Sequence, residues 1–249
     1  MERVINANQP IRLQGTKNTR DLGGYPTKYG INTINGAFLR SDKPEFSVRD
    51  KDVLYRYGVR LIIDLRSSNE VKQGPCTMEG YLDVEYQNIQ LLDNVMSGDG
   101  SQALPDTLVE TYLDLIEHSK ASFLKVFKKI LEYKNECVLF NCTGGKDRTG
   151  VLSMMLLKLT GVPDEVVVAD YAATYFNIME DMERNMAMMK QMGMTIPEQL
   201  MYSEPENMVI TLKHIKDNYG TMEAYLVSIG LHEEEIDALR DKLLGRSVI

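Results

Sequence analysis

The stretch Val138-Leu-Phe-Asn-Cys142-Thr-Gly-Gly-Lys-Asp-Arg148-Thr-Gly-Val-Leu152 decides the fold. Its apolar start predicts a short buried strand over residues 137–140. The run after the loop predicts a helix over residues 148–160 that Gly161 and Pro163 end. A strand that leads through a glycine-containing loop directly into a helix is typical of an open α/β sheet. Ligands of such sheets bind at the carboxyl ends of the strands, which is where Cys142 stands.

The loop between the strand and the helix predicts an anion site. Gly144 and Gly145 allow the backbone to curl tightly, so that successive N–H groups point into one hollow. Arg148 begins the helix, whose N-terminal N–H groups and positive dipole end face the same hollow. A phosphate dianion fits there, and the guanidinium can hold two of its oxygens in a bidentate fork.

The same positive field predicts a nucleophile. A free thiol has a pKa of about 8.5, and a position at a helix N-terminus beside cations lowers such values to roughly 3.5–7.5. We therefore expect Cys142 to attack phosphorus as a thiolate and to form a phosphocysteine intermediate.

Two other kinds of phosphate loop are excluded. The P-loop pattern needs Gly at position 140 and Ser or Thr at position 147, where this chain has Phe140 and Asp147. The glycine spacing of a dinucleotide-binding fingerprint is also missing from this stretch.

Strand and helix signals alternate along the rest of the chain. We expect further strands at residues 36–39, 59–64 and 83–89 and an acidic loop at 92–105. The other predicted helices span residues 47–57, 105–119, 121–133, 164–192, 206–218, 221–229 and 233–243. This order predicts a single domain over residues 1–249 of class α/β. Its central, mainly parallel sheet would be flanked by helices, with a mostly helical portion at residues 164–249.

Composition narrows the function. The net charge of −8 over 249 residues argues against nucleic acid and against an anionic membrane as partners, because both bind to basic surfaces. No apolar run is long enough to predict an integral membrane segment. Three cysteines, Cys76, Cys137 and Cys142, are too few and too irregular for a disulfide framework, so we expect reduced thiols and a cytoplasmic protein.

The run from Cys142 to Gly150 resembles the signature loop of the cysteine-dependent protein tyrosine phosphatases. Its Lys-Asp pair before the Arg is similar to the atypical bacterial tyrosine and dual-specificity phosphatases, whose relatives also attack phosphoinositides. Further segments carry the same resemblance: Asn18-Thr-Arg-Asp-Leu-Gly-Gly-Tyr25, Ile63-Asp-Leu-Arg-Ser67, Val168-Ala-Asp-Tyr171 and Leu239-Arg-Asp-Lys-Leu243. The first of them is a glycine-rich turn that we expect to border the site.

The resemblance implies a reaction and a set of site residues. It implies hydrolysis of phosphotyrosine in proteins by Cys142 and Arg148, with phosphoserine, phosphothreonine or phosphoinositide as further substrates. The loop residues implied to bind phosphate are Thr143, Gly144, Gly145, Lys146 and Thr149. Lys146 could instead be solvated, and Thr149 could either bond the cysteine sulfur or cap the helix. No metal or cofactor is expected, since backbone amides and Arg148 supply the positive charge.

One position departs from the family. A His usually precedes the nucleophile, and this chain has Asn141, which can form hydrogen bonds but cannot carry a positive charge. We therefore expect the loop to keep its shape while stabilisation of the thiolate weakens. One alternative is then a phosphate-binding module with little turnover. A rhodanese-like sulfurtransferase is the other alternative, and the Lys-Asp-Arg continuation favours the phosphatase.

The leaving group needs a proton, and two carboxyl groups are candidates to supply it. Classical family members use an Asp on a loop beside a Trp, but this chain has no Trp. Relatives with the Lys-Asp-Arg variant imply carboxylates at Asp147 and Asp64. Asp147 could instead bond the loop backbone, and Asp64 could form an ion pair with Arg66 or another arginine. Further candidates for the acid are Asp93, Asp99 and Asp106 on the preceding loops. We expect Asp147 to contribute more to catalysis.

Overall fold

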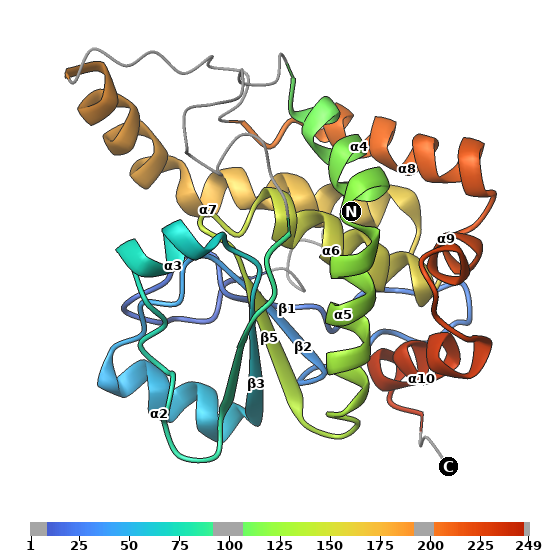
Figure 1. The fold of residues 1–249 in the computed structure, drawn as a ribbon, viewed down its shortest axis with the longest axis horizontal. Coiled ribbons are helices and arrows are strands. Elements are labelled where there is room, and N and C mark those ends of the chain that lie inside the picture. The colour runs from blue at the N-terminus through green and yellow to red at the C-terminus, as the bar shows by residue number, and fades with distance from the viewer. Residues whose placement is uncertain (1–8, 92–106, 192–201, 247–249) are drawn as a thin grey trace.

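The computed structural model describes residues 9–91, 107–191 and 202–246, apart from the side chains of residues 185 and 189. Within these ranges the chain forms a five-stranded sheet in the order β1-β2-β5-β3-β4. The strands are β1 (Arg20–Asp21), β2 (Phe38–Ser41), β3 (Val59–Asp64), β4 (Glu85–Asn88) and β5 (Cys137–Asn141). β1 is antiparallel to β2 and the other pairs are parallel, so the predicted α/β class with a mainly parallel sheet is confirmed (Figure 1).

β5 is the central strand and leads to the signature loop. All five of its residues are buried, as expected for a parallel strand that is covered on both faces. Its last residue, Asn141, is in register with Ser41 of β2 and with Asp64 of β3. The carboxyl ends of three strands therefore meet where Cys142 follows.

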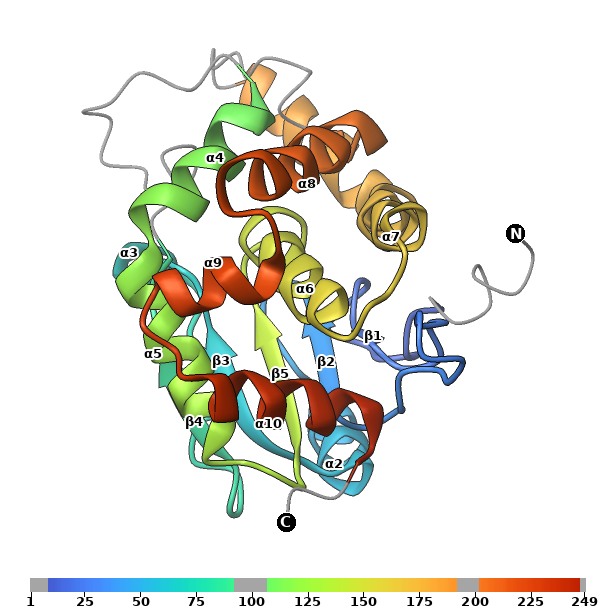
Figure 2. The ribbon, with the colours of Figure 1, turned by 90° about the vertical axis from the view of Figure 1, so that its right-hand side faces the viewer.

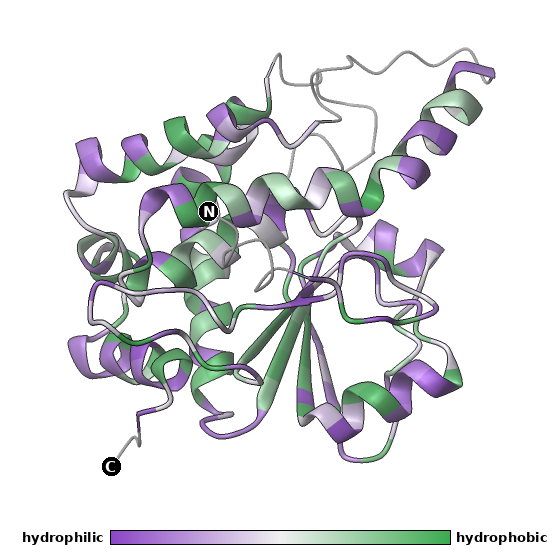
Figure 3. Ribbon diagram, turned by 180° about the vertical axis from the view of Figure 1, so that it is seen from behind, coloured by the Kyte–Doolittle hydropathy of each residue, from purple (hydrophilic) through white to green (hydrophobic). Residues whose placement is uncertain are grey.

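Successive side chains of each strand point to opposite faces of the sheet, so each face has its own core and its own covering helices. Leu61 and Ile63 belong to the larger core, whereas Ile62 belongs to a smaller core that contains Leu54 of α2 (Val48–Tyr57). The larger core lies under α4 (Leu108–His118), α5 (Lys120–Leu131), α6 (Asp147–Leu159), α9 (Met222–Ser228) and α10 (Glu233–Leu244) (Figure 2). Figure 3 shows the strands as the most continuously hydrophobic part of the fold.

Two further helices, α7 (Asp164–Gln191) and α8 (Pro205–Tyr219), lie beyond the carboxyl ends of the strands (Figure 1). α7 packs on α6 and α8, and α8 also packs on α4. Asp170 and Tyr171 of α7 are buried and reach the region of the signature loop. Among the described residues, no helix combines the length and the apolarity that crossing a bilayer needs.

The predicted elements are found with ends shifted by at most three residues, and two elements were missed. One is β1, which is only two polar residues long and has no hydrophobic pattern. The other is α3 (Ser68–Gln73), a short helix that starts with a capping box between Ser67 and Glu70. The acidic loop predicted at residues 92–105 lies outside the described residues.

Candidate active site

The signature loop runs from Cys142 to Lys146, and α6 begins at Asp147. Cys142 is 2% exposed and Arg148, in the first turn of α6, is also 2% exposed. The side chain of Asn18 donates to the carbonyl oxygens of Gly144 (3.0 Å) and Gly145 (3.2 Å). In a trans peptide the N–H points away from the carbonyl, so the next two N–H groups are turned toward the opposite side of the loop. This arrangement is the one that the predicted anion-binding hollow requires.

Gly145 is the position where the loop needs glycine. Its φ of +64° is in the left-handed region. A Cβ at this position would lie 2.7 Å from the carbonyl oxygen of Ser41 and 2.8 Å from the backbone nitrogen of Asp42. The loop can therefore pack against the end of β2 only if residue 145 has no side chain.

A buried cluster of charged residues, Arg20, Arg40 and Asp170, supports the signature loop. Arg40 donates to the carbonyl oxygen of Gly145 over 2.7 Å and forms an ion pair with Asp170. Arg20 lies 3.3 Å from the other oxygen of Asp170 and also donates to Asn18. Burial alone would raise the pKa of Asp170, but the charges of Arg40 and Arg20 outweigh it and lower that pKa. The segment from Asn18 to Tyr25, which we expected to border the site, thus helps to support the backbone of the signature loop.

Glu70 is a site residue that the sequence analysis missed. Its carboxylate accepts from Nη1 and Nη2 of Arg148, both at 2.8 Å, and from the hydroxyl of Thr143 at 2.5 Å. Burial opposes ionisation, but the bonds and charge of Arg148 prevail and lower the pKa of Glu70 to about 2. The sequence signal was the capping-box pattern from Ser67 to Glu70, which places this carboxylate at the start of α3.

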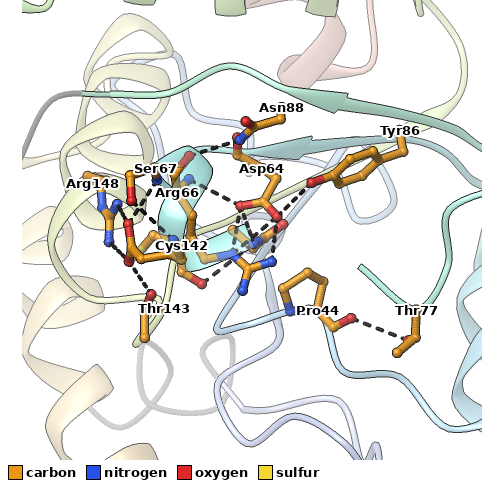
Figure 4. A network of polar contacts seen from close by, with 12 residues as sticks. Pro44, Asp64, Arg66, Ser67, Thr77, Tyr86, Asn88, Cys142, Thr143 and Arg148 are labelled. Carbon is orange, nitrogen blue, oxygen red and sulfur yellow. Dashed lines mark hydrogen bonds and ion pairs between the residues drawn. The ribbon is translucent and has the colours of Figure 1, made fainter. Parts of the chain in front are cut away.

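Asp64 is fully buried and is occupied by several donors. Nε and Nη2 of Arg66 lie 2.9 Å and 2.7 Å from its two oxygens, and the hydroxyl of Tyr86 lies at 3.1 Å. The side-chain amide of Asn141 also donates to it over 3.1 Å. Figure 4 shows Asp64, Arg66 and Tyr86 gathered beside the group that contains Arg148 and Cys142. This geometry corresponds to the ion pair with Arg66 considered above.

Asp147 has a different environment. Its side chain is 20% exposed, and Oδ1 accepts from the hydroxyl of Tyr112 over 2.6 Å. Nζ of Lys146 lies 3.6 Å from the same oxygen. In the described ranges the carboxyl group of Asp147 accepts no hydrogen bond from the loop backbone. The structure therefore does not favour the alternative in which Asp147 bonds the loop backbone.

Two loop side chains had been left with open roles. Lys146 is only 6% exposed, so it is not a solvated surface lysine. The hydroxyl of Thr149 is buried and has no hydrogen-bond partner among the described residues, so it neither bonds the cysteine sulfur nor caps α6 here.

A buried cysteine at the end of a central parallel strand, a tight loop after it and an arginine at the start of a helix are the features that a binding site for a tetrahedral dianion needs. The fold and this loop define a phosphatase of the cysteine-dependent class.

Comparison with known proteins identifies the family. A family model described as the tyrosine phosphatase family matches residues 11–245, so the chain belongs to that family. A tyrosine-protein phosphatase of Nostoc commune is 32% identical over 219 residues, which cover 83% of this chain and 74% of that protein. The triple specificity protein phosphatase PtpB of Mycobacterium tuberculosis is 24% identical over 274 residues, which cover 94% and 98%. The predicted phosphatase function is confirmed, and neither the binding module nor the sulfurtransferase is favoured.

Proposed function

We propose that this chain hydrolyses phosphotyrosine by covalent catalysis on Cys142, with Arg148 holding the phosphoryl oxygens and Asp147 as general acid. The observation that carries the proposal is the placement of Cys142 at the end of β5, under inward N–H groups and the N-terminus of α6. Thr143, Gly144, Gly145 and Lys146 line the phosphate, and Thr149 stands one residue beyond Arg148.

The reaction follows two steps. The thiolate of Cys142 attacks phosphorus, and the bond to the leaving oxygen breaks while Asp147 gives that oxygen a proton. A water molecule then attacks the phosphocysteine and gives a proton to the carboxylate of Asp147. The S–P bond breaks, and inorganic phosphate and the thiolate are released.

The environments of the two carboxyl groups support Asp147 as the acid. Asp64 is 0% exposed and its carboxylate is bonded to Arg66, which leaves little room to approach a substrate. Asp147 is partly exposed and lies in the first turn of α6, next to Arg148. A carboxyl group in this position can reach the bridging oxygen of a bound monoester.

Charges beside the loop favour a phosphotyrosine protein over a phosphoinositide. Lys17 lies 3.0 Å from Asp181, and Lys43 lies 2.9 Å from Glu45. A headgroup with several phosphates requires an excess of positive charge, whereas these lysines are balanced by carboxylates. The reaction also needs Cys142 as a reduced thiol, which favours a cytoplasmic location.

The test uses Cys142→Ser, with Cys76→Ser as the control because Cys76 belongs to the smaller core. We expect Cys142→Ser to lose turnover of a phosphotyrosine peptide at least 1000-fold, on the order of covalent catalysis, yet still bind vanadate. Cys76→Ser should keep turnover, and chelator should not lower it. Substantial activity in Cys142→Ser would refute the mechanism, and faster hydrolysis of phosphoinositide vesicles than of the peptide would refute the substrate assignment.

A further inference from the structure

Behind Asp147 lies a chain of two buried tyrosines that the proposed reaction has not used. The hydroxyl of Tyr112, on α4, lies 2.6 Å from Oδ1 of Asp147 and 2.7 Å from the hydroxyl of Tyr171, on α7. Neither tyrosine is more than 1% exposed. Their rings pack edge to face with centroids 5.8 Å apart, which fixes both hydroxyl groups in place.

The hydrogen bonds from Tyr171 to Tyr112 and from Tyr112 to Asp147 run in one direction. Burial, with the nearby charge of Asp147, raises the pKa of Tyr112 well above its ordinary value, and the same causes raise the pKa of Tyr171. Both hydroxyls therefore stay protonated. A carboxylate can only accept, so Tyr112 gives its one proton to Asp147 and its oxygen must accept from Tyr171.

All of these contacts fall on one oxygen of the carboxyl group. Oδ1 receives the bond from Tyr112, and Nζ of Lys146 lies 3.6 Å from the same atom. Within the ranges that the structure describes, Oδ2 has no hydrogen bond. Among the residues that the structure describes, the titratable groups that face the carboxyl group are Tyr112 from α4, Tyr171 behind it from α7, and Lys146 from the loop.

We propose that Tyr112 and Tyr171 are positioning residues that fix Oδ1 of Asp147 as an acceptor and thereby reserve Oδ2 for the proton that is transferred. Oδ2 gives this proton to the leaving oxygen in the first step and regains one from water in the second. The inference rests on the proposed role of Asp147. It assigns to α4 and α7 a function in catalysis, because each helix supplies one of the two hydrogen-bonded tyrosine hydroxyls.

The test compares Tyr112→Phe and Tyr171→Phe with Tyr225→Phe. Tyr225 is the matched control: it is also buried, and its hydroxyl donates over 2.9 Å to the carbonyl oxygen of Ile116, away from Asp147. The kcat of each variant is measured against pH with p-nitrophenyl phosphate, which has a good leaving group, and with phenyl phosphate, which has a poor one.

We expect Tyr112→Phe to lower kcat for phenyl phosphate about tenfold and for p-nitrophenyl phosphate less than threefold, because only the poor leaving group depends on the acid. This leaving-group dependence separates a positioning role from a general loss of stability, which would lower kcat for both substrates alike. Tyr171→Phe should act in the same direction more weakly, and Tyr225→Phe should change neither quantity.

Asp147→Asn separates failure of this inference from failure of the proposed function. If Asp147→Asn shows the leaving-group dependence but Tyr112→Phe behaves like Tyr225→Phe, the positioning role is wrong and the acid stands. If Asp147→Asn shows no such dependence, the acid itself is misassigned. Adding Tyr112→Phe to Asp147→Asn should cause no further leaving-group effect, and an additive effect would overturn the inference.

Discussion

Asp64 and Asp147 are the same residue type in two different environments, and this contrast is the basis for proposing Asp147 as the general acid. The carboxylate of Asp64 is enclosed by Arg66, Tyr86 and the side-chain amide of Asn141. Asp147 receives one hydrogen bond and keeps one side toward solvent. A carboxyl group that must gain and lose a proton in each cycle needs the second environment.

The two aspartates should respond differently to replacement. Asp147→Asn should lower kcat for phenyl phosphate by about 100-fold or more, the usual range for a general acid, and for p-nitrophenyl phosphate far less. Asp64→Asn should instead lower the free energy of unfolding by roughly 3–5 kcal/mol, because it leaves the buried guanidinium of Arg66 without its counter-charge. The measurements are steady-state kinetics and urea unfolding. A leaving-group effect that appears only in Asp64→Asn would reverse the two roles.

Glu70 should make the stability of the fold depend on pH. Its pKa is about 2 in the folded chain against an ordinary 4.5, so its stabilisation is complete above about pH 4.5 and is lost as pH falls toward 2. The free energy of unfolding of Glu70→Gln should be lower than that of the wild type by up to roughly 3 kcal/mol at pH 6. The gap should close between pH 4.5 and 2.

Urea unfolding at several pH values measures this gap. Glu79→Gln, which replaces an exposed glutamate of the segment after α3, is the control and should show a small, pH-independent difference. A gap for Glu70→Gln that stays constant down to pH 2 would contradict the assigned ion pair with Arg148.

At the scale of the elements, β5 and α6 were predictable because each carries its own signal. β5 is an uninterrupted apolar run, and α6 follows a glycine-containing loop. β1 lacked such a signal, since Arg20 and Asp21 have no hydrophobic pattern and owe their strand conformation to pairing with β2. Secondary structure that depends on a distant partner cannot be derived from local periodicity.

The same distinction applies to the site. Cys142, Asp147 and Arg148 could be predicted as site residues because they lie within seven consecutive positions of one motif. Glu70 and Tyr112 come from other elements and reach the loop only through tertiary packing, so no spacing in the sequence relates them to Cys142. The capping box at Ser67 could have located α3, but it could not have indicated that Glu70 contacts Arg148.

The loop itself provides a matched pair of glycines for a test. Gly145→Ala should abolish phosphate binding, because its φ of +64° is strained for alanine and the new Cβ would lie 2.7 Å from the Ser41 carbonyl oxygen. Gly144→Ala would place its Cβ 3.5 Å from Cδ1 of Ile178, an ordinary contact, and should keep the fold. Vanadate titration and thermal unfolding measure both effects. Equal vanadate affinity in the two variants would show that residue 145 does not determine the shape of the loop.

At the scale of the whole molecule, the loop is held by residues from four separate segments. Asn18 precedes β1, Arg40 belongs to β2, Glu70 to α3 and Asp170 to α7. Asp170 lies at the centre, since it pairs with both Arg20 and Arg40. The geometry of the anion site is therefore a property of the assembled fold.

Asp170→Asn should lower the free energy of unfolding far more than an equivalent change at the surface. Removal of the carboxylate leaves two buried guanidinium groups with no counter-ion, which should cost about 3–5 kcal/mol of unfolding free energy. The control is Asp83→Asn, in an ion pair with Arg60 where the Asp side chain is 65% exposed, and its effect on the free energy of unfolding should be much smaller. Denaturant unfolding of both variants tests the prediction. Similar losses at the two sites would show that the buried cluster does not support the fold.

Because Asp170 lies in α7, after the signature loop in the sequence, it also determines when during synthesis the protein can become active. During synthesis, β5 and the signature loop leave the ribosome before α7, so the nucleophile is made while the counter-ion of Arg40 is still missing. We therefore expect a nascent chain that ends before α7 to have no hydrolytic activity. Upon refolding from urea, we expect catalysis to return no earlier than the docking of α7, because Asp170 pairs with Arg40, which holds the carbonyl oxygen of Gly145. Enzyme activity would then report that α7 has docked, which the helical signal alone does not report.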